Sequence, residues 1–113
     1  MKAIIISAST RTIREVDIKK DADGRGYLTA LQSAVGGYIE LVRINDDEDL
    51  YVNEEGLLHG EEHFFQWEGA SQPFAGNGII VGTDGEGGQC DTKLTAEYVR
   101  SKVRFVKAVV RED

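Results

Sequence analysis

The sequence has few of the features that cross-link or rigidify small proteins or attach them to membranes: it has one cysteine, one proline and no long hydrophobic run. Cys90 has no second cysteine to pair with, so an internal disulfide is excluded and the fold must rest on a packed core. The apolar run at residues 3–6 is far shorter than the roughly 20 residues of a membrane-spanning helix. It ends at Ser7 and Arg11 soon follows, unlike a signal peptide. We therefore expect a cytoplasmic protein.

Positive charge is also scarce. The chain has 13 Lys and Arg against 20 Asp and Glu, a formal net charge of −7. Such a surplus repels nucleic-acid phosphates and anionic lipid headgroups, so we expect no direct nucleic-acid or membrane partner. The one basic run comprises Arg100, Lys102, Arg104, Lys107 and Arg111. We interpret it as the solvated face of a helix.

What is present fits one globular domain spanning residues 1–113. The length suits a single core, and the hydrophobic share of 41% is ordinary for a globular protein. The 13 glycines indicate tight turns and short elements rather than a bundle of long helices.

Periodicity predicts strands and one short helix in the first half. Residues 2–9 and 12–18 favour two antiparallel strands, and residues 21–26 have the composition of a turn. Leu28, Leu31 and Val35 are spaced for one face of a helix, which Gly36 and Gly37 should end. Strands are expected at 38–44 and 50–53, separated by an acidic loop at 45–49. Residues 53–56 predict a hairpin turn with Gly56 at positive φ, returning through 57–58.

The second half is predicted as a strand at 79–82, a glycine-rich loop at 84–88 and a final helix. Thr95 is a good N-cap, with Leu94 and Val99 as a hydrophobic staple. An apolar stripe of Val99, Val103, Val106 and Val110 predicts a helix from residue 96 to about 106. Residues 61–67 fit either a helix or an irregular loop. The fold class is α+β: a small, mainly antiparallel sheet with two to three short helices packed on one face.

Two motifs carry a family resemblance. Residues 31–40, LQSAVGGYIE, and 53–56, NEEG, resemble a family of small phage- and plasmid-encoded proteins known only as a domain of unknown function. Residues 76–82 resemble its later glycine-bounded strand, so the likeness covers about two thirds of the chain. Where that family carries Pro and Asn after the hairpin, this chain has HGEEH at 59–63. The resemblance implies an origin in a phage or other mobile element, an accessory role and, in that case, the host cytoplasm; it implies no activity.

Residues 59–63 also fit the H-x-x-E-H pattern of inverted zinc peptidases, which makes His59, Glu62 and His63 weak metal-ligand candidates. Gly60 disfavours the required helix, and no third histidine exists in the chain. A polar surface loop is the favoured interpretation. Residues 19–24 resemble part of a calcium loop but lack its end ligands, which favours a solvated turn.

No catalytic residue and no cofactor is predicted. The glycine-rich loop follows a strand as phosphate-binding loops do, but it has no Lys-Ser/Thr pair, and Asp84 and Glu86 would repel phosphate. Cys90 has no histidine near it in sequence, so an unreactive thiol is expected.

Two groups are candidates for a partner-binding surface. The aromatic segment, with Phe64, Phe65, Trp67 and Phe74, fits either the core of a small sheet or an interface anchor. The acidic group consists of Asp46, Asp47, Glu48 and Asp49.

The first functional hypothesis is a non-enzymatic protein that binds or inhibits a host protein through an acidic surface. The alternative is a binder of a nucleotide-like small molecule, with its pocket between the glycine-rich loop and the aromatic segment. A metal-dependent hydrolase is a remote third. Self-association into a homo-oligomer is left open.

Overall fold

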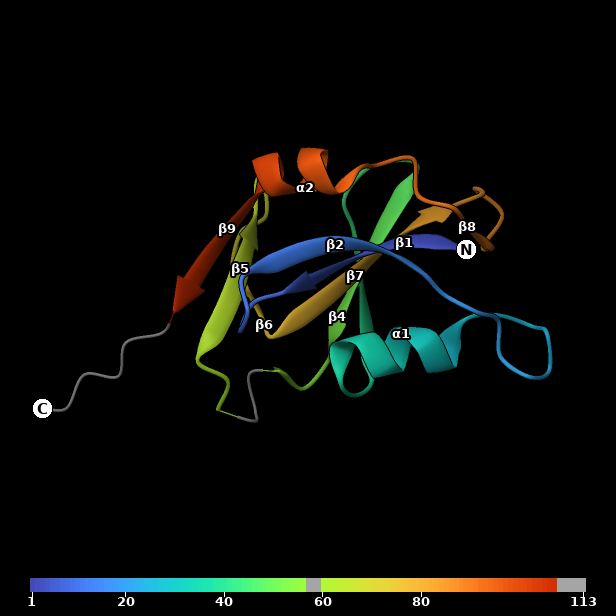
Figure 1. Ribbon diagram of the computed structural model, residues 1–113, viewed down its shortest axis with the longest axis horizontal. Helices are drawn as coiled ribbons and strands as arrows, with labels where there is room; N and C mark the ends of the chain where they lie inside the picture. The colour runs from blue at the N-terminus through green and yellow to red at the C-terminus, as the bar shows by residue number, and fades with distance from the viewer. Residues whose placement is uncertain (57–59, 108–113) are drawn as a thin grey trace, which may run out of the picture.

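The computed structural model describes residues 1–56 and 60–107, which form two antiparallel sheets and two short helices (Figure 1). The larger sheet has the strand order β2-β1-β7-β4-β3, with β8 pairing with β7; the smaller has the order β6-β5-β9. The strands are β1 Lys2–Ser7, β2 Thr12–Asp17, β3 Ile39–Arg43, β4 Glu48–Asn53, β5 His63–Trp67, β6 Phe74–Ala75, β7 Asn77–Thr83, β8 Gln89–Cys90 and β9 Val103–Lys107. The helices are α1 Leu28–Val35 and α2 Ala96–Lys102. The α+β class and the mainly antiparallel sheet are confirmed.

The centre of the larger sheet is built from β-branched and apolar residues. In β1 and β7, Ile4 pairs with Ile80, and both are fully buried. The next strand, β4, pairs Leu50 with Ile80 and Tyr51 with Ile79. Side chains alternate between the faces of a strand, so each central strand supplies a buried residue to both faces.

Helix α1 covers one face of this sheet. Its Leu31 and Val35 are buried in one cluster with Ala3, Tyr51, Ile79 and Val81. The predicted stop is confirmed: Gly36 takes the left-handed conformation, with φ 81°, and donates its N–H to the Gln32 carbonyl. With eight residues, α1 leaves parts of this face open.

The smaller sheet and α2 cover the opposite face. Phe65, Trp67 and Val99 join Ile4, Ile6, Ile13, Leu50, Val52 and Ile80 in the second core cluster. The two helices therefore lie on opposite faces of the larger sheet, and the prediction that the helices pack on one face is wrong. The reason is the second sheet, in which β5 (His63–Trp67) pairs with both β6 and β9.

The final helix is shorter than predicted. The Thr95 cap is confirmed, because its Oγ1 accepts the Tyr98 N–H at 3.1 Å. The helix ends at Lys102, and Val103–Lys107 forms β9, paired with β5 from Trp67↔Val103 to His63↔Lys107. The spacing of the valines at 103 and 106 predicts a helical stripe, but both are β-branched and their pairing with β5 decides their conformation. Val110 and Arg111 lie outside the described residues.

Three loop predictions also need correction. Glu48 and Asp49, expected in an acidic loop, are the first residues of β4. Residues 61–67 are neither helix nor irregular loop throughout, since β5 occupies 63–67. Gly56 is not among the positive-φ glycines of the described chain. The predicted return at 57–58 lies outside the described residues. In the described part of the chain, no helix has the length and apolarity needed to cross a membrane.

Candidate functional site

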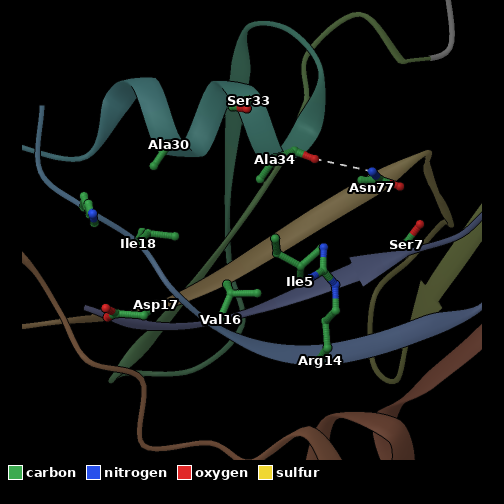
Figure 2. A pocket seen from close by; sticks show the side chains of 11 residues that line it. Ile5, Ser7, Arg14, Val16, Asp17, Ile18, Ala30, Ser33, Ala34 and Asn77 are labelled. Atoms are coloured by element: carbon green, nitrogen blue, oxygen red, sulfur yellow. Dashed lines mark hydrogen bonds between the residues drawn. The ribbon is translucent and has the colours of Figure 1, made fainter.

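The face of the larger sheet that α1 leaves partly open carries a groove beside this helix and a smaller hollow beside the glycine-rich loop. The larger, about 530 Å³, is a groove between α1 and strands β1 and β2 (Figure 2). Ala30, Ser33 and Ala34 line it from the helix, and Arg14 reaches into it from β2. Its polar groups are exposed or already bonded: Asn77 Nδ2 donates to the Ala34 carbonyl at 3.4 Å. At the far end, Asp17 pairs with the N-terminal amine at 2.7 Å, which lowers the Asp17 pKa.

The smaller hollow, about 190 Å³, lies beside the glycine-rich loop, and we call it the Asp49 hollow. Its walls are Leu41, Arg43, Asp46, Asp49, Tyr51, Thr83, Gly85, Gly87, Gly88 and Gln89. The strand members share one face because β3, β4, β7 and β8 are paired in register, with Leu41↔Tyr51, Arg43↔Asp49 and Thr83↔Gln89.

The glycine-rich loop is held by its own side chains. Asp84 Oδ1 accepts the N–H groups of Glu86 at 2.8 Å and Gly88 at 3.0 Å. Gly85 donates its N–H to Thr83 Oγ1, and the Asp84 N–H bonds the Gly88 carbonyl. Four amide groups of the loop are thus engaged, so the loop is not organised as a phosphate cradle.

Exposed acids lie on the two loops that border the hollow. Asp46 lines it directly, and the adjacent Asp47 carbonyl accepts the Thr83 N–H at 2.8 Å, which joins the 45–47 turn to the glycine-rich loop. In that loop Glu86 is exposed, and so is Asp84, whose carboxylate folds back on the loop amides; Asp46 and Asp47 are exposed as well. We call these four residues the acidic corner. The nearby bases are Arg43 and Lys93, whose Nζ lies 3.9 Å from Asp47 Oδ2.

Asp49 forms the inner wall of the hollow. Its side chain is 8% exposed, and its Oδ1 lies 3.5 Å from Arg43 Nε. Within the described residues, this Oδ1 is the buried side-chain atom that makes no hydrogen bond. Arg43 is itself 66% exposed, so the pair is half in solvent. Beside it, Gln89 Nε2 donates to Tyr51 Oη at 3.1 Å.

The structure separates the predicted acidic group. Asp46 and Asp47 are exposed as expected, but Glu48 is 1% exposed and Asp49 6%. Glu48 faces away from the hollow and accepts a hydrogen bond from Thr92 Oγ1 at 2.7 Å. The prediction that Glu48 and Asp49 belong to an acidic outer surface is wrong, because both are strand residues with neighbours packed over them.

The aromatic segment is mostly core. Phe65 is fully buried and Trp67 is 8% exposed, so neither presents a surface to a partner. Phe65 packs against Phe74 with ring centroids 5.5 Å apart. Phe64 is half-buried and stays a candidate. The sheet separates these rings from the Asp49 hollow, since Phe65 and Trp67 pack on its opposite face. The predicted pocket between the glycine-rich loop and the aromatic segment is therefore wrong.

The H-x-x-E-H segment is not helical where it is described. His63 begins β5, and its Nδ1 lies 3.2 Å from Glu61 Oε1. The backbone N–H of His63 donates to the same carboxylate, and this bond is the main cause of a lowered Glu61 pKa. Among the described residues, no three His, Cys, Asp or Glu side chains converge as metal ligands. Glu62 is exposed, and His59 lies outside the described residues.

Cys90 and the calcium-like turn offer no reactive group. Burial raises the pKa of the Cys90 thiol, and the carboxylates of Asp84 and Glu48 add to the rise. A thiol so placed is a poor nucleophile at neutral pH. Residues 21–26 close as a turn through the Asp21 N–H and the Gly26 carbonyl, 2.8 Å apart.

The sequence prediction missed Arg43, Tyr51 and Gln89. One signal was available: alternation along 48–53 places Asp49, Tyr51 and Asn53 on one face and Glu48, Leu50 and Val52 on the other. The loop prediction for Glu48 and Asp49 hid that pattern. The approach of Gln89 to Tyr51 depends on β8, which no local signal predicted.

Comparison with known families gives one match. The family described as Domain of unknown function (DUF3846) matches residues 1–104, nearly the whole chain. No match was found among curated proteins or among solved structures. The chain therefore belongs to the DUF3846 family.

Proposed function

We propose that this chain is a non-enzymatic binding protein that engages a basic host protein through the acidic corner. The observation that supports the proposal most is that the two loops bordering one hollow carry four exposed acids, Asp46 and Asp47 on one loop and Asp84 and Glu86 on the other. Clustered charge of one sign speeds association with an oppositely charged partner and limits the choice of partner.

The proposal includes an accessory role in a phage or other mobile element, acting in the host cytoplasm. It also includes the absence of direct nucleic-acid binding. Within the described residues, the basic run is divided between α2 and β9, so it is not the single helix face that the sequence predicts. Arg100 Nη2 donates to the Ile13 carbonyl, and Lys102 pairs with Glu68 at 2.8 Å. Neutralising several phosphates would require more free cations on one face.

The test is affinity capture from host lysate at low and high salt, followed by measurement of binding to the captured protein. The corner variant carries Asp46→Asn, Asp47→Asn and Glu86→Gln, and it leaves Asp84 to hold the loop. The matched control carries Glu54→Gln, Glu62→Gln and Glu97→Gln, which remove as many exposed charges elsewhere.

We expect a basic protein that is captured at low salt, released at high salt, lost by the corner variant and kept by the control. Equal loss in both variants would show that total charge, not the corner, attracts the protein. Micromolar binding of duplex or single-stranded DNA at low salt would contradict the proposal.

A further inference from the structure

The Asp49 hollow is small and polar on one side. A volume of about 190 Å³ is below the range of pockets that enclose whole metabolites, and it suits a single head group. Tyr51 and the half-exposed Leu41 give it an apolar side, while Asp49, Gln89 and Asp46 give it acceptors and donors.

Asp49 is the unusual group in this hollow. A carboxylate can accept about four hydrogen bonds, and a buried polar atom without one costs free energy. Oδ1 of Asp49 makes none within the described residues, and Arg43 approaches it with Nε at 3.5 Å without forming a hydrogen bond. The carboxylate therefore has unused capacity for a donor that enters the hollow.

The surroundings favour a cation over an anion. The two loops that border the hollow carry the four exposed acids of the acidic corner, of which Asp46 lines the hollow, against the bases Arg43 and Lys93. Four of the loop amides that could hold an anion are occupied by Asp84 Oδ1, Thr83 Oγ1 and the Gly88 carbonyl. A negatively charged ligand would meet repulsion without a set of free donors.

We propose that the Asp49 hollow seats one basic side chain, arginine or lysine, of the protein bound at the acidic corner. This inference rests on the proposed function and specifies its central contact. The incoming guanidinium or ammonium group donates to the Asp49 carboxylate, and its aliphatic stem lies along Leu41 and Tyr51. Arg43 is the internal competitor, since its guanidinium holds the place beside Asp49 until a better-aligned donor displaces it into solvent.

The test uses small probes and isotope-labelled protein. N-acetyl-arginine methylamide and its lysine counterpart are titrated into the full chain and followed by amide NMR, with the neutral citrulline analogue as the matched probe. We expect saturable shifts at Asp49, Gly85, Gly87 and Gly88 with the cationic probes and none with citrulline. Asp49→Asn should weaken arginine binding about tenfold, the effect of losing a hydrogen bond between charged groups.

Arg43→Gln distinguishes two roles of the Arg43–Asp49 pair, a cation-binding site and an ion pair that only supports the fold. Removing the competitor should tighten arginine binding, whereas loss of mere structural support would weaken it. Arg43 is exposed, so this variant keeps the test valid if Asp49→Asn folds poorly. Glu62→Gln, at the start of the other sheet, is the single-charge control and should bind as the wild type does.

The outcomes separate this inference from the proposed function. Three results would each contradict binding of a basic side chain in the Asp49 hollow. They are equal shifts with citrulline, no saturable shift with arginine, and binding of inorganic phosphate that Arg43→Gln abolishes. If the corner variant loses the captured protein while Asp49→Asn keeps full affinity, the proposed function is supported, but the partner's basic side chain does not bind in the Asp49 hollow. If arginine binds in the predicted manner but no basic protein is captured, the hollow binds a basic side chain and the proposed function is wrong.

Discussion

Glu48 and Asp49 are neighbours in β4, but they face opposite sides of the larger sheet and meet different environments. Glu48 lies on the face packed against the second sheet, where Thr92 donates a short hydrogen bond to it. Asp49 lies on the face that α1 covers in part, and its buried Oδ1 makes no hydrogen bond within the described chain. The comparison teaches that two adjacent buried carboxylates of one strand can differ, since the fold supplies Glu48 with a donor and leaves Asp49 Oδ1 available.

The same contrast holds for apolar residues. Phe65 is fully buried between the two sheets, whereas Leu41 on the face of α1 is 49% exposed. A face covered by a whole sheet buries its side chains, and a face covered by an eight-residue helix keeps open margins. The candidate site lies at such a margin, where burial is sufficient to position Asp49 and incomplete enough to admit a ligand.

The largest expected effect is on the packed face. Phe65→Ala should lower the free energy of unfolding by about 3–5 kcal/mol, because it removes a large side chain and leaves a cavity. Leu41→Ala on the other face should cost less than about 1 kcal/mol. Urea unfolding measures both through the transition midpoint and slope. Similar losses for the two variants would show that the faces do not differ in packing as described.

The second prediction compares the two carboxylates. Thr92→Val leaves the buried Glu48 without its donor, and we expect a loss of about 1–3 kcal/mol. Asp49→Asn removes a charge whose ion-pair partner within the described residues is the largely exposed Arg43, and a change within about 1 kcal/mol is expected. Thermal and urea unfolding give both values. If Asp49→Asn lowered the free energy of unfolding more than Thr92→Val, Asp49 would serve to stabilise the fold and not to bind a ligand.

The third prediction concerns the helix that covers the site face. Gly36 ends α1 at φ 81°, so Gly36→Ala should cost about 1–2 kcal/mol. Gly26→Ala is the control, because its backbone is outside the positive-φ range and an added Cβ meets nothing within 4 Å. The difference between the two variants in urea unfolding isolates the cost of the left-handed cap. Equal stability would show that α1 can end without it.

Local signals predicted the elements that are determined locally. The pair of first strands, the helix at 28–35 with its glycine stop and the Thr95 cap each depend on residues within a few positions of one another. The second sheet could not be predicted in this way. It pairs 63–67 with 103–107, and the valines of the latter segment fit a helical stripe until that distant pairing is known.

The candidate site was predicted in part for the same reason. Asp46 and Asp47 were expected at the surface from composition, and they lie there. Asp49 was placed in a loop because acidic runs are usually solvated, whereas pairing with β3 and β7 makes it a strand residue. The hollow itself needs β8 and the glycine-rich loop to return beside β4, a contact between residues nearly forty positions apart.

The smallest expected effect concerns an exposed ion pair. Its contribution to the free energy of unfolding is the reference against which the contributions of Glu48 and Asp49 are compared. Lys102 Nζ lies 2.8 Å from Glu68 Oε2, joining α2 to the end of β5. The hydrogen bond from Lys102, and then its charge, lower the Glu68 pKa below its ordinary value of 4.5. Because the folded pKa is the lower one, the pair stabilises the fold above about pH 4.5, and this contribution is lost as pH falls through the folded pKa.

Glu68→Gln should therefore lower stability slightly at neutral pH, and the difference from the wild type should vanish in acid. Lys102 shows the opposite sign: its pKa is raised from 10.5, so its share persists below that value and is lost as pH rises through the folded pKa. Melting temperatures across the pH range, at low and high salt, measure both limbs, with Glu54→Gln as the exposed control. Since both side chains are in solvent, high salt should reduce the difference further. A difference that persisted in acid would mean that Glu68 acts through packing, and the exposed pair would then no longer serve as the reference for Glu48 and Asp49.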